Sequence, residues 1–244
     1  RSVGCSCSPP GAGGGGGRRG VVLFGAGRRG LVCGEGALAV VTWACAEARI
    51  LAVEPQTQVV VDVPSGRLKT VATVEHGRVR SVTFQNVPSF VLIDDLPLRI
   101  GPRSVKVAVA YGGAFYAILP SEAFEIPVEP AYLPRLIELG REIKAKVEAV
   151  KEVVHPLNAE LRDIYGVIFT QGNRNVTIFA DGEVDRSPCG SGTSARLALL
   201  DWRGELAGGT ALVHESIVGT QFSGRVVGDA QVGEVPAVIT EVEG

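Results

Sequence analysis

The stretch DRSPCGSGTSARLALL, residues 185–200, changes from loop composition to a helical pattern at Cys189 and Gly190. Pro188 and the glycines around the cysteine favour a turn, and the small and apolar residues of 193–200 are typical of a buried helix. A helix start carries unpaired N–H groups and a partial positive charge, which attract anions and favour thiolate over thiol. We therefore predict that Cys189 is a reactive thiol at a helix N-terminus.

The same pattern occurs a second time, 156 residues earlier (189 minus 33), where CGEG at 33–36 runs into the apolar segment 37–43. Each copy can sit in its own α/β lobe, and two similar lobes that face one another form a cleft. Glycines let the backbone approach a ligand closely, as carboxylate-binding turns require. A thiolate and a thiol on opposite faces of one bound α-carbon can remove and supply a proton, which inverts that carbon without a cofactor.

Composition narrows the class of protein. The chain has 244 residues, 45% of them hydrophobic, which fits a globular protein of one large or two modest domains. Lys and Arg number 24 against 26 Asp and Glu, so we expect no nucleic acid and no membrane as partner. No apolar run approaches the roughly 20 residues of a bilayer span, and no signal-peptide pattern is present. Five irregularly spaced cysteines and three scattered histidines argue against a disulfide framework and a metal site. We expect a cytoplasmic protein with a small-molecule ligand.

The pattern of apolar residues predicts a mixed α and β class. Apolar residues at helical spacing predict a helix over 131–154, ended by Pro156, and the glycine-rich run 11–17 predicts a disordered tail over 1–20. The predicted organisation is a first lobe at 21–110, a second lobe at 111–230 and a return segment at 231–244. Alternating or β-branched runs predict strands at 58–63, 68–74, 79–84, 105–111, 114–119, 166–170, 176–180, 222–227 and 236–242.

Residues 185–195, DRSPCGSGTSA, resemble the signature of the proline racemase family, which also contains 4-hydroxyproline 2-epimerases and trans-3-hydroxyproline dehydratases. The likeness covers most of 31–244 and is carried by further matching segments at 32–36, 82–90, 113–117 and 214–220. It implies an α+β fold like that of diaminopimelate epimerase: two pseudosymmetric α/β lobes, each with a sheet around a central helix, and an active site in the cleft between them.

The resemblance also implies roles for individual residues. Cys33 and Cys189 are the implied acid/base pair. The backbone at Gly34, Gly190 and Ser191 is implied to hold the substrate carboxylate, and Asp185 is implied to meet the substrate nitrogen. The implied substrate is an imino acid, either proline or hydroxyproline, with no cofactor. A homodimer is a further expectation, but the sequence does not fix the oligomeric state.

Two residues bear on the choice within the family. Dehydratases that resemble this sequence typically have threonine where Cys189 stands, because elimination of water needs one base at the α-carbon. The retained cysteine favours a racemase or epimerase, and trans-3-hydroxyproline dehydratase is the alternative. Tyr165 lies where 4-hydroxyproline epimerases often carry histidine, which favours proline itself.

The chain departs from the family pattern at Glu35, which replaces the histidine of Cys-Gly-His-Gly. A carboxylate there disfavours a thiolate at Cys33 and repels a substrate carboxylate, or else pairs with the substrate ammonium. Compared with the family, the chain also begins late and ends early, so we expect an incomplete first lobe. An imino-acid-binding relative with impaired catalysis is therefore a further alternative.

A competing pattern lies near the N-terminus. Strand-like residues 21–24 run into GAGRRG at 25–30, which fits the G-x-G-x-x-G of a dinucleotide site, with Glu47 or Glu54 about 20 residues on. A helix should begin within such a motif, but Gly34 and Gly36 interrupt it. An NAD-binding oxidoreductase is the alternative that this motif supports.

Overall fold

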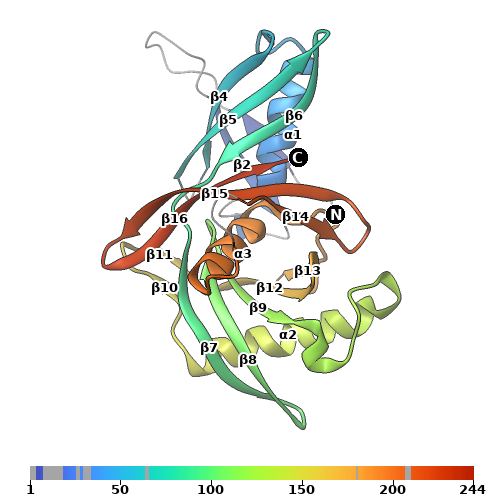
Figure 1. Cartoon of the computed structure of the whole chain (residues 1–244), viewed down its shortest axis with the longest axis vertical. Coiled ribbons are helices and arrows are strands. Elements are labelled where there is room, and N and C mark those ends of the chain that lie inside the picture. Colours follow the sequence, from blue (N-terminus) through green and yellow to red (C-terminus); the bar gives the residue numbers. More distant parts are fainter. Residues whose placement is uncertain are drawn as a thin grey trace.

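The computed structural model describes residues 4–7, 19–25, 28–29, 34–63, 66–179, 181–206 and 210–244. Within these ranges, one long, strongly twisted sheet runs through the molecule and three α-helices pack on it (Figure 1). The strand order is β1-β2-β4-β5-β6-β16-β15-β14-β13-β12-β9-β8-β7, with β3 paired to β2. Of the predicted tail 1–20, residues 4–7 and 19–20 belong to strands, and the rest lies outside the described residues.

The upper part of the sheet in Figure 1 packs around α1, Gly34–Ala46. This helix is apolar on almost every side, although Trp43 on one side is 48% exposed. Its side chains at Ala37, Leu38 and Val41 pack in one hydrophobic cluster with Leu68 and Phe84 of the neighbouring strands. The strands are β1 Gly4–Cys7, β2 Arg19–Gly25, β3 Arg28–Arg29, β4 Gln56–Val63, β5 Gly66–Glu75 and β6 Arg78–Gln85.

The lower part of the sheet has a helix on each face. Since neighbouring strand residues point to opposite faces, Val167 and Phe169 pack in the cluster of α2, Leu133–Val150, while Ile168 packs in that of α3, Gly190–Trp202. The strands are β7 Phe90–Ile100, β8 Arg103–Tyr111, β9 Phe115–Pro120, β12 Ile164–Gln171, β13 Arg174–Phe179 and β14 Leu212–Ser216. The turns η1 Ser121–Phe124 and η2 Pro130–Tyr132 precede α2, and β10 Val154–His155 pairs with β11 Asn158–Arg162.

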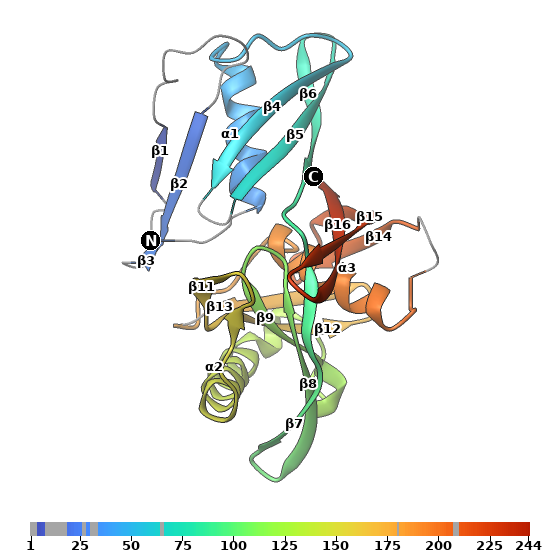
Figure 2. The same cartoon turned by 90° about the vertical axis from the view of Figure 1, so that its left-hand side faces the viewer.

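A hairpin of β15, Gln221–Val232, and β16, Val235–Glu243, joins the two parts of the sheet. β16 pairs antiparallel with β6, with Val242 opposite Phe84. The pairing extends into the segment between β6 and β7, because the Asn86 N–H donates to the Thr240 carbonyl and Ser89 bridges to Val238. Figure 2 shows β6 running down past this hairpin into β7.

The structure confirms all nine predicted strands, with shifts at their ends. The predicted helix over 131–154 is wrong at its C-terminus: α2 ends at Val150, and Val154 belongs to β10. Lys151 is already extended, and the Val153 carbonyl accepts from the Asp163 N–H, so pairing with the following hairpin ends the helix. Among the described helices, none combines the length and the apolarity that crossing a membrane requires.

The glycine motif at 25–30 does not form a strand followed by a helix. Arg28 and Arg29 form β3, which turns back and pairs antiparallel with Gly25 and Phe24 of β2. Residues 26–27 and 30 lie outside the described residues. A dinucleotide site places a helix N-terminus directly after the first strand, so the β2–β3 hairpin contradicts the NAD-binding alternative.

Candidate active site

Cys189 stands directly before α3, in the place that the sequence predicts. Its side chain is 1% exposed, and its carbonyl accepts hydrogen bonds from the backbone N–H and the hydroxyl of Thr193, at 2.7 Å and 2.8 Å. Its φ is +69° and its ψ is 106°, a conformation that is uncommon for any residue except glycine. Such a backbone is strained, and strain of this kind concentrates at functional sites.

The first residues of α1 and α3 touch each other. A Cβ atom added to Gly34 would lie 2.8 Å from the Gly190 Cα and 3.1 Å from the Gly190 carbonyl carbon. Only glycine permits this approach, because any side chain at position 34 collides with backbone. Two helix N-termini, each with a partial positive charge, therefore meet at one point, which favours the binding of an anion there.

A glycine turn after β8 supports the start of α3 from the other side. A Cβ at Gly112 would lie 2.2 Å from the Ser191 carbonyl oxygen and 2.5 Å from the Ala195 backbone nitrogen. The Asn86 side chain holds this turn by donating to the Gly112 carbonyl at 2.8 Å. The first turn of α3 is thus fixed against the sheet by backbone contact.

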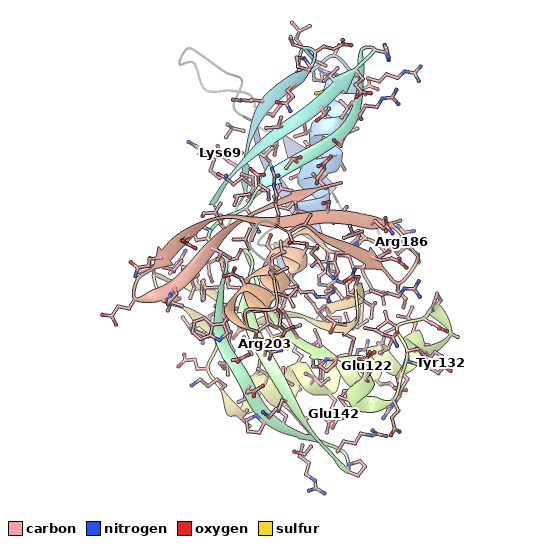
Figure 3. All side chains as sticks on the ribbon, in the orientation of Figure 1. Lys69, Glu122, Tyr132, Glu142, Arg186 and Arg203 are labelled. Carbon is pink, nitrogen blue, oxygen red and sulfur yellow. The ribbon has the colours of Figure 1, made fainter. Side chains whose placement is uncertain are left out.

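The loop that leads into Cys189 is held by Asp185. One carboxylate oxygen of Asp185 accepts from the backbone N–H and the hydroxyl of Ser187, at 2.9 Å and 2.8 Å. The Ser187 hydroxyl oxygen in turn accepts from the Cys189 N–H at 3.0 Å. Asp185 is 8% exposed, whereas Arg186 beside it is exposed at the edge of the molecule, where its carbonyl accepts from Thr220 (Figure 3).

Aromatic side chains line the sheet beside the cysteine. The hydroxyl of Tyr116, on β9, lies 2.7 Å from the Ser191 Oγ and 3.6 Å from the Cys189 Sγ. The rings of Tyr116 and Tyr165 make a T-shaped contact with their centroids 6.0 Å apart. The centroids of the Tyr165 and Phe179 rings are 5.2 Å apart. Tyr165 and Phe179 are half-buried, so they form an apolar wall next to the start of α3.

Buried polar side chains support α3 from behind. The Thr193 hydroxyl lies 2.8 Å from the Nδ1 of His214, a side chain with no exposed surface. Burial, with a smaller effect of the nearby Arg196 charge, holds the pKa of His214 well below its usual range, so its ring is neutral. Burial likewise lowers the pKa of Arg196 to about 10.

The structure brings together the predicted residues Gly34, Asp185, Cys189, Gly190 and Ser191. Cys33 and the side chain of Glu35 lie outside the described residues. Sequence reasoning gave no role to Tyr116, Ser187 and His214, although all three lie in segments that carry the family resemblance. It also gave no role to Asn175, whose side chain donates to the Pro188 carbonyl at 2.9 Å.

Comparisons with known proteins show which family this chain resembles in sequence. A family model described as proline racemase matches residues 15–244. A trans-3-hydroxy-L-proline dehydratase from Bacillus cereus is 38% identical, covering 99% of this chain and 74% of that protein. A 3-hydroxyproline 2-epimerase from Burkholderia multivorans is 42% identical, covering 87% of this chain and 66% of that protein.

A solved structure shares the fold over most of this chain. It is a hydroxyproline epimerase from Agrobacterium vitis with bound trans-4-hydroxy-L-proline, 31% identical, with a TM-score of 0.89 over 93% of this chain and 68% of that one. This likeness confirms the predicted fold class. The chain spans about two thirds to three quarters of the length of these relatives.

Proposed function

The chain belongs to the proline racemase family, whose model matches residues 15–244, and from this premise we propose that it racemises or epimerises proline or hydroxyproline at the α-carbon. The observation that carries the proposal is the contact between Gly34 and Gly190, which joins the N-termini of α1 and α3. Relatives named for hydroxyproline epimerisation, one of them with trans-4-hydroxy-L-proline bound, support an imino acid as the ligand.

Chain connectivity extends this contact to a pair of cysteines. Cys33 directly precedes Gly34 and Cys189 directly precedes Gly190, and consecutive Cα atoms are about 3.8 Å apart. We therefore infer that the two cysteines lie in the same neighbourhood, and the proposed mechanism depends on this. In the proposed mechanism, one sulfur is a thiolate that removes the α-proton, and the other is a thiol that delivers a proton to the opposite face.

The remaining residues bind and orient the imino acid. Backbone N–H groups at Gly34, Gly190 and Ser191 hold the carboxylate, where negative charge grows as the α-proton leaves. Asp185 pairs with the ring ammonium, and Glu35 assists it from the first turn of α1. After inversion the thiolate has become a thiol and the thiol has become a thiolate. Before the enzyme can convert another molecule of the same enantiomer, the two sulfurs must regain their original protonation states.

A second candidate is the elimination of water from trans-3-hydroxyproline, which the name of the Bacillus cereus relative favours. Elimination needs one base at the α-carbon and no thiol on the opposite face. The thiol of Cys189, buried and directly before α3, supports inversion over elimination. An imino-acid-binding protein without proton transfer is the third candidate, because Glu35 stands where the family pattern has histidine.

The test follows the α-proton in deuterated water. We expect the protein to invert L-proline or trans-4-hydroxy-L-proline and to place solvent deuterium on the α-carbon, measured by circular dichroism and proton NMR. Cys33→Ser and Cys189→Ser each lower inversion by about 10²- to 10⁴-fold, the usual contribution of one general acid or base. Each variant keeps one sulfur, and it should still exchange the α-proton of the enantiomer whose α-proton points toward that sulfur.

Other outcomes assign the alternatives. Loss of water from trans-3-hydroxy-L-proline without inversion of either substrate identifies a dehydratase. Calorimetric binding of an imino acid with no deuterium exchange identifies a binding protein. Inversion by Cys189→Ser at the wild-type rate refutes the two-cysteine mechanism. A homodimer, a cytoplasmic location and the lobe boundaries at 21–110, 111–230 and 231–244 stay predictions, which sedimentation, cell fractionation and limited proteolysis can check.

A further inference from the structure

Tyr116 is a buried titratable side chain that the proposed mechanism does not use. It lies on β9, which is hydrogen-bonded to β8 on one side and β12 on the other, and its side chain has no exposed surface. Its ring makes a T-shaped contact with the ring of Tyr165. Because backbone and ring are both held, the hydroxyl has a fixed position beside the start of α3.

This hydroxyl has two possible partners at that start. The Ser191 Oγ is 2.7 Å away and the Cys189 Sγ is 3.6 Å away, within reach of a hydrogen bond to sulfur. A phenol has one proton, so it donates to one of these atoms at a time and accepts from the other. Tyr116 therefore has two hydrogen-bonding arrangements that need no movement of its ring.

The phenol keeps its proton in both arrangements. Burial, the charge of Cys189 as a thiolate and the nearby Tyr165 together hold the pKa of Tyr116 well above its usual range. The side chain is thus a hydrogen-bond donor and does not take part in proton transfer.

We propose that Tyr116 is a positioning residue whose hydroxyl follows the charge on Cys189, donating to the sulfur when it is a thiolate and to Ser191 when it is a thiol. In the first arrangement the Ser191 hydroxyl donates to the Tyr116 oxygen. In the second, the Cys189 S–H donates to that oxygen and the Ser191 hydroxyl is released toward the substrate carboxylate. No covalent bond changes, and only hydroxyl and thiol protons rotate.

In the part of the chain that the structure describes, the titratable side chains of Asp185 and His214 act on the Cys189 backbone in the hydrogen bonds described above. Asp185 reaches the Cys189 N–H through Ser187, and His214 reaches the Cys189 carbonyl through Thr193. Tyr165, from β12, contacts the Tyr116 ring. The Tyr116 hydroxyl reaches the sulfur itself, so its removal tests the sulfur separately from the backbone around it.

The inference rests on the proposed function, but its test does not require turnover. The variant is Tyr116→Phe, which keeps the packed ring and removes the hydroxyl. The matched control is Tyr111→Phe, another buried tyrosine on the adjacent strand β8, whose pKa is also raised by burial. The readout is the pH dependence of iodoacetamide alkylation at Cys189, followed by mass spectrometry of its peptide.

We expect Tyr116→Phe to raise the pKa of the Cys189 thiol by about one to two units, since a hydrogen bond to a charged group is lost. Deuterium exchange at the α-carbon then falls by about 10- to 100-fold in kcat with little change in KM, and the limb of the pH profile that belongs to Cys189 moves to higher pH. Tyr111→Phe leaves both readouts at their wild-type values.

Fluorotyrosine at position 116 provides the opposite perturbation, because a more acidic phenol is a stronger donor. It should lower the pKa of the Cys189 thiol without altering the packing. An unchanged thiol pKa in both substitutions at 116, or an equal shift in Tyr111→Phe, overturns the proposal. A raised thiol pKa in a protein that exchanges no imino acid supports the role of Tyr116 and contradicts the proposed function.

Discussion

Replacing Gly34 with alanine tests whether the contact between two helix starts is the catalytic geometry. The added Cβ would lie 2.8 Å from the Gly190 Cα, which is 0.6 Å short of the 3.4 Å at which ordinary contact begins. It would also lie 2.8 Å from the Cζ of Phe84. The Cζ of Phe84 lies on the axis of ring rotation and the side chain is fully buried, so ring rotation does not relieve this contact. The Gly190 atom belongs to the backbone, so α1 and α3 must separate by about 0.6 Å to restore ordinary contact.

The predicted effect on activity is much larger than the effect on stability. Overpacking costs about 1–3 kcal/mol, and the better helix propensity of alanine offsets about 0.5–1 kcal/mol of this loss. A misplacement of about 1 Å between reacting groups can lower the rate by about 100-fold. Gly34→Ala should therefore fold, lose at most about 2.5 kcal/mol in the free energy of unfolding, and lose most of its α-proton exchange.

Urea denaturation and deuterium exchange of an imino acid measure the two effects. The control is Gly228→Ala on β15, where an added Cβ has no atom within 4 Å, so both quantities should stay at the wild-type value. Gly34→Ala with wild-type exchange refutes the reasoning, because the helix starts would then tolerate separation. Equal loss in both variants points to a general effect of the substitution.

Two further predictions concern stability. His214 is buried and neutral, with its pKa held far below the usual value of about 6.5, so the unfolded chain binds a proton that the folded chain does not. Below about pH 6.5 the free energy of unfolding should fall by up to about 1.4 kcal/mol per pH unit through this group. Urea titrations at a series of pH values measure this slope, and His214→Gln should remove the contribution of His214 to it. A slope that His214→Gln leaves unchanged contradicts the burial argument. At Cys189 the φ of +69° favours glycine. The variant Cys189→Gly should therefore be about 1 kcal/mol more stable than Cys189→Ala, although alanine is the more stable residue at most positions. A higher melting temperature for Cys189→Ala than for Cys189→Gly contradicts the strain at this residue.

The sequence predicted the strands well where alternation of apolar and polar residues was regular, and it failed where pairing partners override local pattern. β7, Phe90–Ile100, was not predicted, because Asp94, Asp95 and Pro97 interrupt its apolar run and its pairing with β8 shifts register twice. β7 is the last strand of the sheet order, and an edge strand tolerates a proline that an inner strand cannot.

The candidate site was predictable where its residues are contiguous or belong to the repeated Cys-Gly-x-Gly pattern, which joined Gly34 to Gly190. Asp185, Cys189 and Ser191 belong to one motif, so their proximity follows from a short loop and the first turn of a helix. Tyr116 reaches Cys189 from 73 residues away and His214 reaches Thr193 from 21 residues away. Such contacts depend on strand order and register, which a local pattern does not contain.

The contact between the starts of α1 and α3 is unfavourable by itself, because each end carries about half a positive elementary charge and the two ends repel. The sheet supplies the opposing force, since β16 pairs with β6 and the Asn86 N–H donates to the Thr240 carbonyl, so neither helix withdraws without breaking strand pairing. A carboxylate between the ends turns this repulsion into attraction. In the proposed reaction the charge on this carboxylate increases as the α-proton leaves, so the attraction is stronger in the transition state than with bound substrate. If the two helix ends separate, the carboxylate keeps the attraction of only one end, which is about half of the total positive charge. Because that attraction is stronger in the transition state, separating the ends should lower the rate of catalysis more than the affinity for the substrate.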